Sequence, residues 1–371
     1  MYVIEVIPLL LGTTLDTLSY YSSVEYPVGS FLSVPIRNHV KRAIVVNVHT
    51  VTDNKSALRA AAFTLKKLPP QEKISTVPEH LRTTAKALTK IYPSSMGAIL
   101  YQLLPPEVRQ GKYHYPAISS FTQIEETLPR VLIARQKERY IAYRSHIRST
   151  LARRGSVLFV VPTSAAIPYA VAELALGIED RIVVFSPTNS EKERRAAYTA
   201  FEDTALAKLI ITTPSHAYLD RVDLLSIVIE NEASEYYKDR ERPYLDHRTA
   251  LLTHAKTTGR SILLGDILPR SETEYRRREE IFTTEGEETK RINFTAPCTV
   301  IEQKDKPSPE RPFSLFSKEL LTRITNTLSS RGHVFIYAAR RGIAPVVVCI
   351  DCGHIFRCPD SNTPYSLVRT L

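Results

Sequence analysis

The chain has 371 residues, of which 43% are hydrophobic and 24% are charged, a composition typical of globular proteins with two or three domains. Lys and Arg outnumber Asp and Glu by 49 to 39, which gives a net charge of +10. This charge is equally consistent with a polyanionic partner and with a basic protein that has no such partner. No run of about 18 apolar residues occurs, which excludes a transmembrane helix. The first residues lack the features of a secretory signal, and the cysteines are too clustered for a disulfide framework. We therefore expect a cytoplasmic protein without a membrane partner.

The first 110 residues are predicted to be rich in β-structure and to end in helices. The expected strands are residues 3–8, 29–35 and 43–48. A helix is predicted over residues 78–91, and residues 93–106 are apolar at helical spacing until two prolines stop the pattern.

From residue 130 onwards the pattern changes to strands that alternate with helices, which is typical of a parallel sheet with a RecA-like order. The expected strands are residues 131–134, 156–162, 182–185, 208–213, 225–230 and 261–265, and the expected helices are residues 136–154, 165–176 and 191–201. Residues 272–290 and 303–312 are charged or proline-rich and are expected to be solvated. A last unit is predicted to contain a helix at 317–329, a strand at 334–337 and a cysteine cluster.

Four segments resemble the primosomal protein N′ (PriA) family, which restarts replication forks with an ATP-driven helicase. Near the end of the chain, residues 340–345 (Arg-Arg-Gly-Ile-Ala-Pro) and the run of cysteines after them resemble the start of the family's zinc region. Residues 236–248 resemble an aromatic and basic stretch of the helicase lobe. The remaining resemblance lies in residues 15–46 and 91–111, which are similar to the family's domain for binding DNA ends.

The resemblance implies an α/β protein with a β-rich DNA-binding domain, a RecA-like parallel-sheet helicase lobe and the start of a second lobe with a partial zinc motif. The implied domains are residues 1–112 for binding 3′ ends, a linker at 113–129 where the family's winged helix is absent, a degenerate lobe 1 at 130–300, and residues 313–371 for the start of lobe 2.

The positions that match the family's ATPase motifs carry the wrong side chains. A phosphate-binding loop needs glycines, a lysine and a hydroxyl residue, but residues 133–140 contain no glycine, and Arg139 and Tyr140 stand at the lysine and hydroxyl positions. We expect Arg139 to lie on the surface of a helix N-terminal turn. Glu230 could hold a metal ion, but Asn231 stands where the family has its general base and cannot accept a proton. The sequence therefore predicts that ATP and Mg²⁺ are not used.

The cysteine cluster has half of a zinc-ribbon spacing. Cys349, Cys352 and Cys358 are followed by Ser361 at the fourth position, whereas structural zinc takes four thiolate or imidazole ligands. The incomplete set favours a chain without any bound cofactor, with zinc as the alternative.

The resemblance places a pocket for a DNA 3′ end in the first domain. Asp16 matches an aspartate of that pocket, where it would accept hydrogen bonds from the terminal hydroxyl, although it could equally stabilise a turn. Tyr20 could stack on a base or belong to a sheet. The basic residues of the predicted turn between two strands are expected to contact phosphates, or else simply to be solvated. They are Arg37, Lys41 and Arg42.

The first hypothesis for function is a PriA-like protein that binds DNA forks or 3′ ends without hydrolysing ATP, with primosome or single-strand-binding proteins as further partners. The first alternative is an active ATP-dependent 3′-to-5′ DNA helicase with an atypical site. The second is a protein-interaction scaffold of the primosome that has lost DNA affinity, and the third is a truncated copy of a longer protein.

Overall fold

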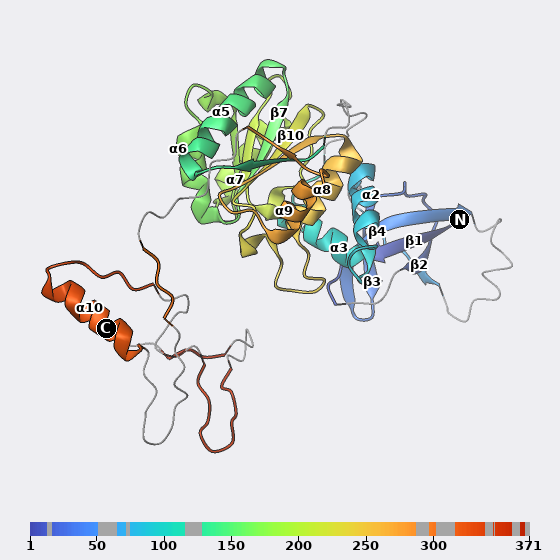
Figure 1. Ribbon diagram of the computed structural model, residues 1–371. Coiled ribbons are helices and arrows are strands. Elements are labelled where there is room, and N and C mark those ends of the chain that lie inside the picture. The colour runs from blue at the N-terminus through green and yellow to red at the C-terminus, as the bar shows by residue number, and fades with distance from the viewer. Residues whose placement is uncertain are drawn as a thin grey trace. The chain divides into compact units, whose positions relative to one another are not determined.

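The computed structural model describes residues 1–12, 17–50, 65–71, 75–115, 128–286, 297–301, 316–337, 344, 346–357 and 364–367. The chain forms two compact units, residues 1–291 and residues 292–371, each of which is described by itself (Figure 1). Among the residues described, no helix has the length and apolar character that crossing a membrane requires.

The first unit begins with a five-stranded sheet in the order β3-β4-β1-β2-β5. Its strands are β1 (Tyr2–Pro8), β2 (Leu18–Ser22), β3 (Phe31–Ile36), β4 (His39–Thr50) and β5 (Lys66–Lys67). Strand β1 pairs antiparallel with β2 and β4, and β3 and β4 form a hairpin. Because side chains alternate between the faces of a strand, Ile4, Val6, Leu32 and Val34 all point into one small core.

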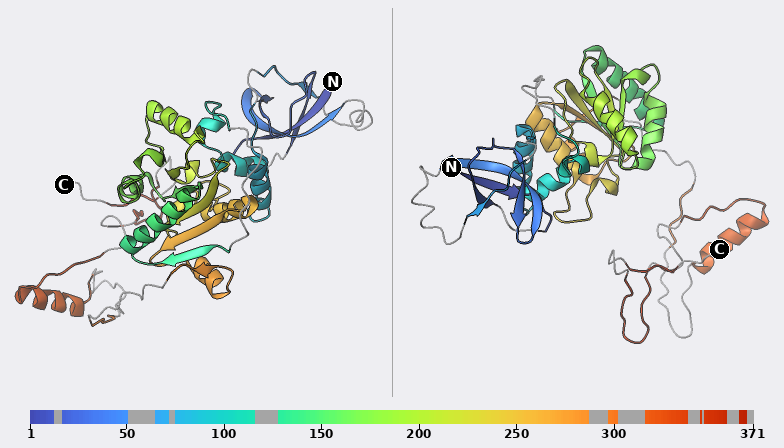
Figure 2. Two further views of the ribbon diagram at one scale, coloured as in Figure 1. Left: turned by 90° about the horizontal axis from the view of Figure 1, so that it is seen from above. Right: turned by 180° about the vertical axis from the view of Figure 1, so that it is seen from behind.

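Three helices follow this sheet and lie beside it in each view (Figures 1 and 2). They are α2 (Glu79–Leu88), α3 (Met96–Leu103) and the short α4 (Pro106–Arg109), which confirms the two helical predictions in this region. Helix α3 begins at Ser95, whose side chain accepts a hydrogen bond from the backbone N–H of Ala98. It packs closely on β1, because a Cβ at Gly97 would overlap the carbonyl oxygen of Pro8.

The larger part of the first unit is an α/β fold around a seven-stranded sheet in the order β12-β6-β11-β10-β7-β9-β8. All of its neighbouring strands pair parallel, which confirms the predicted parallel sheet. The strands are β6 (Arg130–Ile133), β7 (Ser156–Val160), β8 (Ile182–Phe185), β9 (Leu209–Thr212), β10 (Leu224–Glu230), β11 (Ser261–Asp266) and β12 (Thr283–Thr284). Strand β12 comes from a segment that was expected to be only solvated, and it pairs with β6 at the edge of the sheet.

Helices cover both faces of this sheet. One core contains side chains of α5 (Gln136–Ala152) and α6 (Ile167–Leu174), and the other contains side chains of α7 (Glu191–Glu202), α8 (His247–Thr258), α2 and α3. Figure 1 shows α5 and α6 on one side of the sheet and α2 with α8 on the other. The helices that follow the N-terminal sheet are therefore part of the hydrophobic layer of the α/β fold. A further helix, α9 (Ser271–Arg278), follows β11.

A buried cluster of charged and polar side chains joins α2 to α8. His80 on α2 contacts the Asp220 carboxylate, which also accepts a hydrogen bond from Arg260. His254 on α8 lies beside them and shares hydrogen bonds with Thr84 Oγ1 at 3.2 Å and with Arg260 at 3.4 Å. The ligand atoms of the two histidines and Asp220 lie within 4.8 Å of one another. The Arg260 guanidinium already contacts Asp220 and His254, so its positive charge opposes a metal ion there.

The second unit contains α10 (Lys318–Ser329), which confirms the helix expected at 317–329. The strand expected at residues 334–337 is not present, and Phe335 and Tyr337 are 89% and 81% exposed. The described part of this unit offers no neighbouring strand with which this β-branched and aromatic segment could pair.

Candidate functional site

The junction between β6 and α5 is the place where a parallel-sheet nucleotide site would hold phosphates. Two of its backbone donors are used inside the protein. The N–H of Ala134 donates to the carbonyl oxygen of Asp266 at 3.1 Å, and the N–H of Arg135 donates to the Glu138 carboxylate at 3.1 Å. A phosphate-binding loop depends on free backbone N–H groups and on glycines, and residues 133–140 contain no glycine, so this junction lacks the features of such a loop.

Arg139 is buried, which corrects the expectation that it lies on the surface. Its side chain is 2% exposed and forms a two-pronged ion pair with Glu230, with N–O distances of 3.0 Å from Nε and 2.5 Å from Nη2. The same guanidinium donates to the carbonyl oxygen of Ala134 and to Asn231 Oδ1, each at 2.8 Å. Lys137, two positions earlier, is exposed.

A second side chain of α5 also donates a hydrogen bond to the Glu230 carboxylate. Tyr143 donates its hydroxyl hydrogen bond to Glu230 Oε2 at 2.7 Å. Burial, with a further contribution from the charge of Glu230, raises the pKa of Tyr143, so this hydroxyl stays a donor. Both oxygens of Glu230 therefore have protein partners, and the arrangement does not fit a metal ion bound through this carboxylate. Glycine is required at position 265, because a Cβ there would overlap the Tyr143 hydroxyl.

The ion pair also determines the charge of Arg139. Burial alone would lower the pKa of the guanidinium, but the hydrogen bonds and the charge of Glu230 outweigh burial and raise it. Arg139 therefore keeps its positive charge although it is buried. Tyr140, at the position of the family's hydroxyl residue, is 1% exposed and packs its ring against Tyr143 and Phe159. Its side chain belongs to the core beneath α5.

Two further carboxylates, one at the family's acidic motif and one at the end of β11, hold loops together. Glu232 is fully buried, and its carboxylate accepts hydrogen bonds from the backbone and side chain of Arg270 at 2.7 and 2.9 Å. The Asp266 carboxylate accepts hydrogen bonds from the backbone N–H groups of Ala233 and Ile267. These contacts fix the segments that follow β10 and β11.

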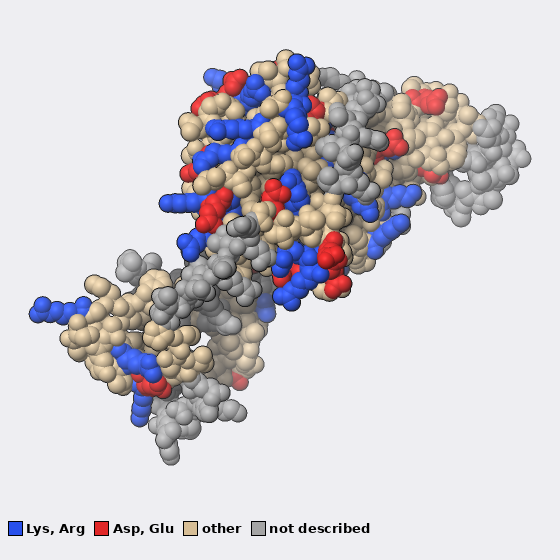
Figure 3. All heavy atoms as spheres, turned by 45° about the horizontal axis from the view of Figure 1, so that its top comes forward, with Lys and Arg blue, Asp and Glu red and all other residues tan. Residues whose placement is uncertain are grey.

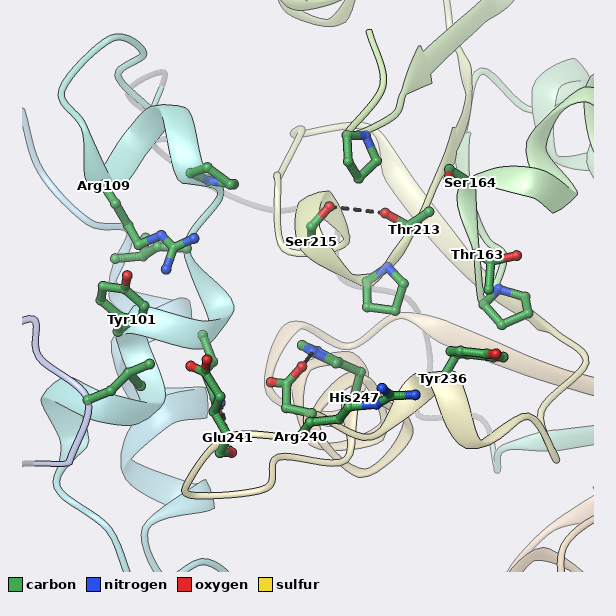
Figure 4. Close-up of a pocket in the computed structure, with 18 residues that line it drawn as sticks. Tyr101, Arg109, Thr163, Ser164, Thr213, Ser215, Tyr236, Arg240, Glu241 and His247 are labelled. Carbon is green, nitrogen blue, oxygen red and sulfur yellow. Dashed lines mark hydrogen bonds and ion pairs between the residues drawn. The ribbon is translucent and has the colours of Figure 1, made fainter. Parts of the chain in front are cut away.

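A pocket of about 550 Å³ opens at the carboxyl ends of β7 and β9 (Figure 4). Figure 4 shows Thr163, Ser164, Thr213 and Ser215 on one side of it, and α3 and α4 on the other. The lining also contains basic, acidic and aromatic side chains, namely Tyr101, Arg109, Tyr236, Asp239, Arg240, Glu241 and His247.

The loop that follows β10 contributes an exposed aromatic ring between two hollows. Tyr236 is 57% exposed and lines both this pocket and a second hollow of about 580 Å³ that also contains Lys238, Arg248 and Arg270. The hydroxyl of the neighbouring Tyr237 donates to the carbonyl oxygens of Val160 and Glu230, which anchors the loop to the sheet. The exposed ring of Tyr236 is thus held by a buried neighbour.

The residues predicted to bind a DNA end are dispersed. Asp16 lies outside the described residues. Tyr20 is 4% exposed and belongs to the core of the five-stranded sheet. Its hydroxyl donates a hydrogen bond to the carbonyl oxygen of Pro35. The ring therefore has a structural role in the sheet, which was the alternative to base stacking. Arg37 and Lys41 are exposed at the β3–β4 hairpin. Arg42 is half-buried over the ring of Phe31, and burial lowers its pKa.

Cys349 and Cys352 lie in a tight turn. The N–H of Cys349 donates to the carbonyl oxygen of His354, and the N–H of Gly353 donates to the carbonyl oxygen of Cys349. Hydrogen bonds from the backbone of Cys352 and Asp351 lower the pKa of the Cys349 thiol, which favours the thiolate that binds zinc. Two thiols are half of a tetrahedral site, and Cys358 lies outside the described residues.

Basic side chains are spread over the first unit. On the face shown in Figure 3, Lys and Arg side chains are interspersed with Asp and Glu and do not form one continuous patch. Several charges on this unit are paired, as for Arg144 with Glu173 and Arg195 with Glu191. The net charge alone therefore does not locate a binding surface.

Comparison with known proteins identifies the relatives of the chain. It is 24% identical to replication restart protein PriA of Haemophilus influenzae over 230 residues, which are 60% of this chain and 30% of that protein. The chain is PriA-like. The PriA proteins of Bacillus subtilis and Rickettsia prowazekii are 20% and 27% identical over 58% and 41% of the chain, and they are covered over 27% and 23% of their own lengths. The chain thus spans less than a third of these PriA proteins, and no protein-family model matches it.

Solved structures add only distant likenesses to this PriA-like chain. The C-terminal domain of a possible DNA helicase from Lactobacillus plantarum is 12% identical with a TM-score of 0.31, and covers 45% of this chain and 99% of that one. Domain 2 of the DEAD-box helicase Mss116p, bound to an RNA duplex, is 15% identical with a TM-score of 0.30, and covers 55% of this chain and 76% of that one. TM-scores this low do not establish a common fold.

Sequence reasoning missed two features of the site. The pairing of Arg139 with Glu230 joins residues 91 positions apart, and only the resemblance, which put both into one ATPase site, could have suggested their contact. The hydroxyl residues of the pocket follow the ends of predicted strands, as in Val-Pro-Thr163-Ser after β7 and Thr213-Pro-Ser215 after β9. Their position at the carboxyl ends of parallel strands was the signal that could have identified them.

Proposed function

We propose that this PriA-like chain binds DNA and does not hydrolyse ATP. The observation that carries the proposal is the buried ion pair of Arg139 with Glu230 at the positions that match the family's phosphate and magnesium motifs. A nucleotide would have to break this pair, and breaking a buried pair costs about 3–5 kcal/mol. Asn231 cannot act as a general base, so water activation has no side chain at that position.

The pocket at the carboxyl ends of β7 and β9 is the proposed DNA-binding surface. In open parallel sheets, ligands bind at the carboxyl ends of the strands. Hydroxyl and guanidinium groups, here from Ser164, Ser215 and Arg240, suit phosphate oxygens, and the exposed ring of Tyr236 suits a base. Single-stranded DNA would thus find hydrogen-bond donors and a stacking platform together.

Two finer points remain proposals. By resemblance, the exposed cations Arg37 and Lys41 with Asp16 would contact a fork or a 3′ end, and primosome or single-strand-binding proteins would be further partners. A zinc ion at Cys349 and Cys352 would use Cys358 and a fourth ligand, and it would order the second unit without taking part in chemistry.

The experiment is fluorescence-anisotropy titration of a labelled single-stranded oligonucleotide with the full chain. Tyr236→Ala should weaken binding by about 1–3 kcal/mol, the usual contribution of one stacked base. The matched control is Tyr275→Ala, which removes an equally exposed tyrosine on α9 that does not line the pocket, and it should bind as the parent chain does. Equal losses in both variants, or no binding by the parent chain, would contradict the proposal.

A further inference from the structure

A chain of hydrogen bonds runs from α4 to the pocket through His216. His216 Nε2 lies 3.0 Å from Glu107 Oε2 on α4, and its Nδ1 lies 2.9 Å from Ser215 Oγ. Ser215 Oγ in turn lies 3.0 Å from Thr213 Oγ1, a contact drawn in Figure 4. Ser215 and Thr213 line the pocket, whereas His216 is 2% exposed behind them.

Among the described residues, the charged and titratable groups that contact His216 or its partner Glu107 support one orientation of the imidazole protons. Glu107 is the acceptor on one side, and Arg194 and Tyr198 on α7 bind the same carboxylate at 3.1 and 3.3 Å. Burial would raise the pKa of Glu107, but its hydrogen bonds and the charges of His216 and Arg194 lower it to about 2. Arg194 is paired with this carboxylate whatever the charge of His216, so Glu107 stays ionised beside a neutral imidazole. On β8, Phe185 stacks on the imidazole and brings no charge.

The ionised Glu107 fixes the tautomer of a neutral His216. The proton must be on Nε2, because a lone pair there would face the carboxylate at 3.0 Å. The other nitrogen, Nδ1, then carries a lone pair and accepts the hydroxyl hydrogen of Ser215. In this state Ser215 offers only its oxygen lone pairs to the pocket, and it repels a phosphate oxygen.

Protonation of His216 reverses the hydrogen bond to Ser215. Both imidazole nitrogens are donors in the cation, so Nδ1–H donates to Ser215 Oγ and the hydroxyl hydrogen is released. Ser215 can then donate to a phosphate oxygen in the pocket. Glu107 lies on the far side of the ring and stabilises the cation.

We propose that His216 is a positioning residue that couples the binding of a backbone phosphate at Ser215 to the uptake of one proton. The inference rests on the proposed DNA-binding function and deepens it, because it assigns the phosphate contact to one hydroxyl and its control to Glu107 and His216. Binding is then tighter at lower pH, by at most about tenfold per pH unit for one proton.

The test is calorimetric titration of an oligo-thymidine strand into the full chain near pH 7, in two buffers with different ionisation enthalpies. The difference between the buffers gives the number of protons taken up. The parent chain should take up a fraction of one proton per site, and Ser215→Ala should bind more weakly and take up fewer. This small, half-buried change is the decisive variant, because it leaves the imidazole and its buried contacts in place.

His216→Gln should remove the same proton uptake, and His333→Gln, which changes an exposed histidine of the second unit, should leave it unchanged. Equal proton uptake by the parent chain and Ser215→Ala would overturn the proposal while DNA binding stands. If the parent chain binds the strand without any proton uptake, the proposal is likewise wrong. If it does not bind at any pH between 5.5 and 8.5, the proposed function itself fails and the inference fails with it.

Discussion

At the scale of single residues, Glu230→Gln tests the importance of the buried ion pair. The change keeps the shape of the side chain but leaves the Arg139 guanidinium, 2% exposed, without its counter-charge. We expect a loss of about 3–5 kcal/mol in the free energy of unfolding, measured by urea denaturation at pH 7.

The double variant Arg139→Met with Glu230→Leu is the matched control for that loss. Replacing a buried pair with apolar residues of similar size is often neutral, so most of the lost stability should return. If the single variant were as stable as the parent chain, the pair would not be a structural element of the protein.

Gly265 provides a second test at this scale. A Cβ at this position would overlap the hydroxyl of Tyr143, which holds Glu230 in place. Gly265→Ala should therefore lower the free energy of unfolding by about 1–3 kcal/mol, the usual cost of overpacking a core. Adding Tyr143→Phe removes the overlapping oxygen and should recover part of that loss. An unchanged transition midpoint for Gly265→Ala would show that α5 can move away from β11.

At the scale of elements, the contact between α2 and α8 predicts how stability depends on pH. Burial lowers the pKa of His254 to about 3, although the charge of Asp220 raises it. An unfolded histidine titrates near 6.5, so between about pH 6.5 and pH 3 the unfolded chain binds a proton that the folded chain does not. The folded state should lose up to about 1.4 kcal/mol for each pH unit over this window.

Urea denaturation at pH 7.5, 6 and 5 measures this dependence. In His254→Gln the free energy of unfolding should fall less steeply below pH 6.5 than in the parent chain. His39→Gln is the control, because His39 is exposed on β4. His146, whose pKa burial lowers to about 4, should contribute a parallel loss that both variants keep. A parent chain that is as stable at pH 5 as at pH 7.5 would contradict the buried position of His254.

The elements also show what the sequence alone could predict. Buried parallel strands such as β7 and β10 are continuous apolar runs, and their pattern is unambiguous. Helix α8 was missed because its sequence, rich in threonine, has little helical periodicity and is held by burial against α2. The predicted strand at 334–337 is absent, because a β-branched run needs a partner strand to form a ladder. Arg139 was placed on the surface because its partner, Glu230, lies on another strand.

At the scale of the whole molecule, the PriA-like chain combines a buried ion pair, at positions that match the family's ATPase motifs, with the pocket proposed to bind DNA. The five-stranded sheet, α2 and the seven-stranded sheet belong to one compact unit, and the core beneath α7 and α8 extends into the helices of the first 110 residues. The ion pair lies at the end of β10, whereas the pocket lies at the ends of β7 and β9 of the same sheet. A change in the ATPase position can therefore leave the pocket intact.

ATP turnover by the full chain tests the central claim most directly. Phosphate release would be followed with Mg²⁺ and ATP, with and without saturating single-stranded DNA, for the parent chain and for Arg139→Ala. We expect that DNA binds and that neither protein releases phosphate above the background measured without protein. Phosphate release that DNA stimulates in the parent chain would contradict this expectation, and its loss in an Arg139→Ala variant that still binds DNA would make Arg139 a catalytic residue.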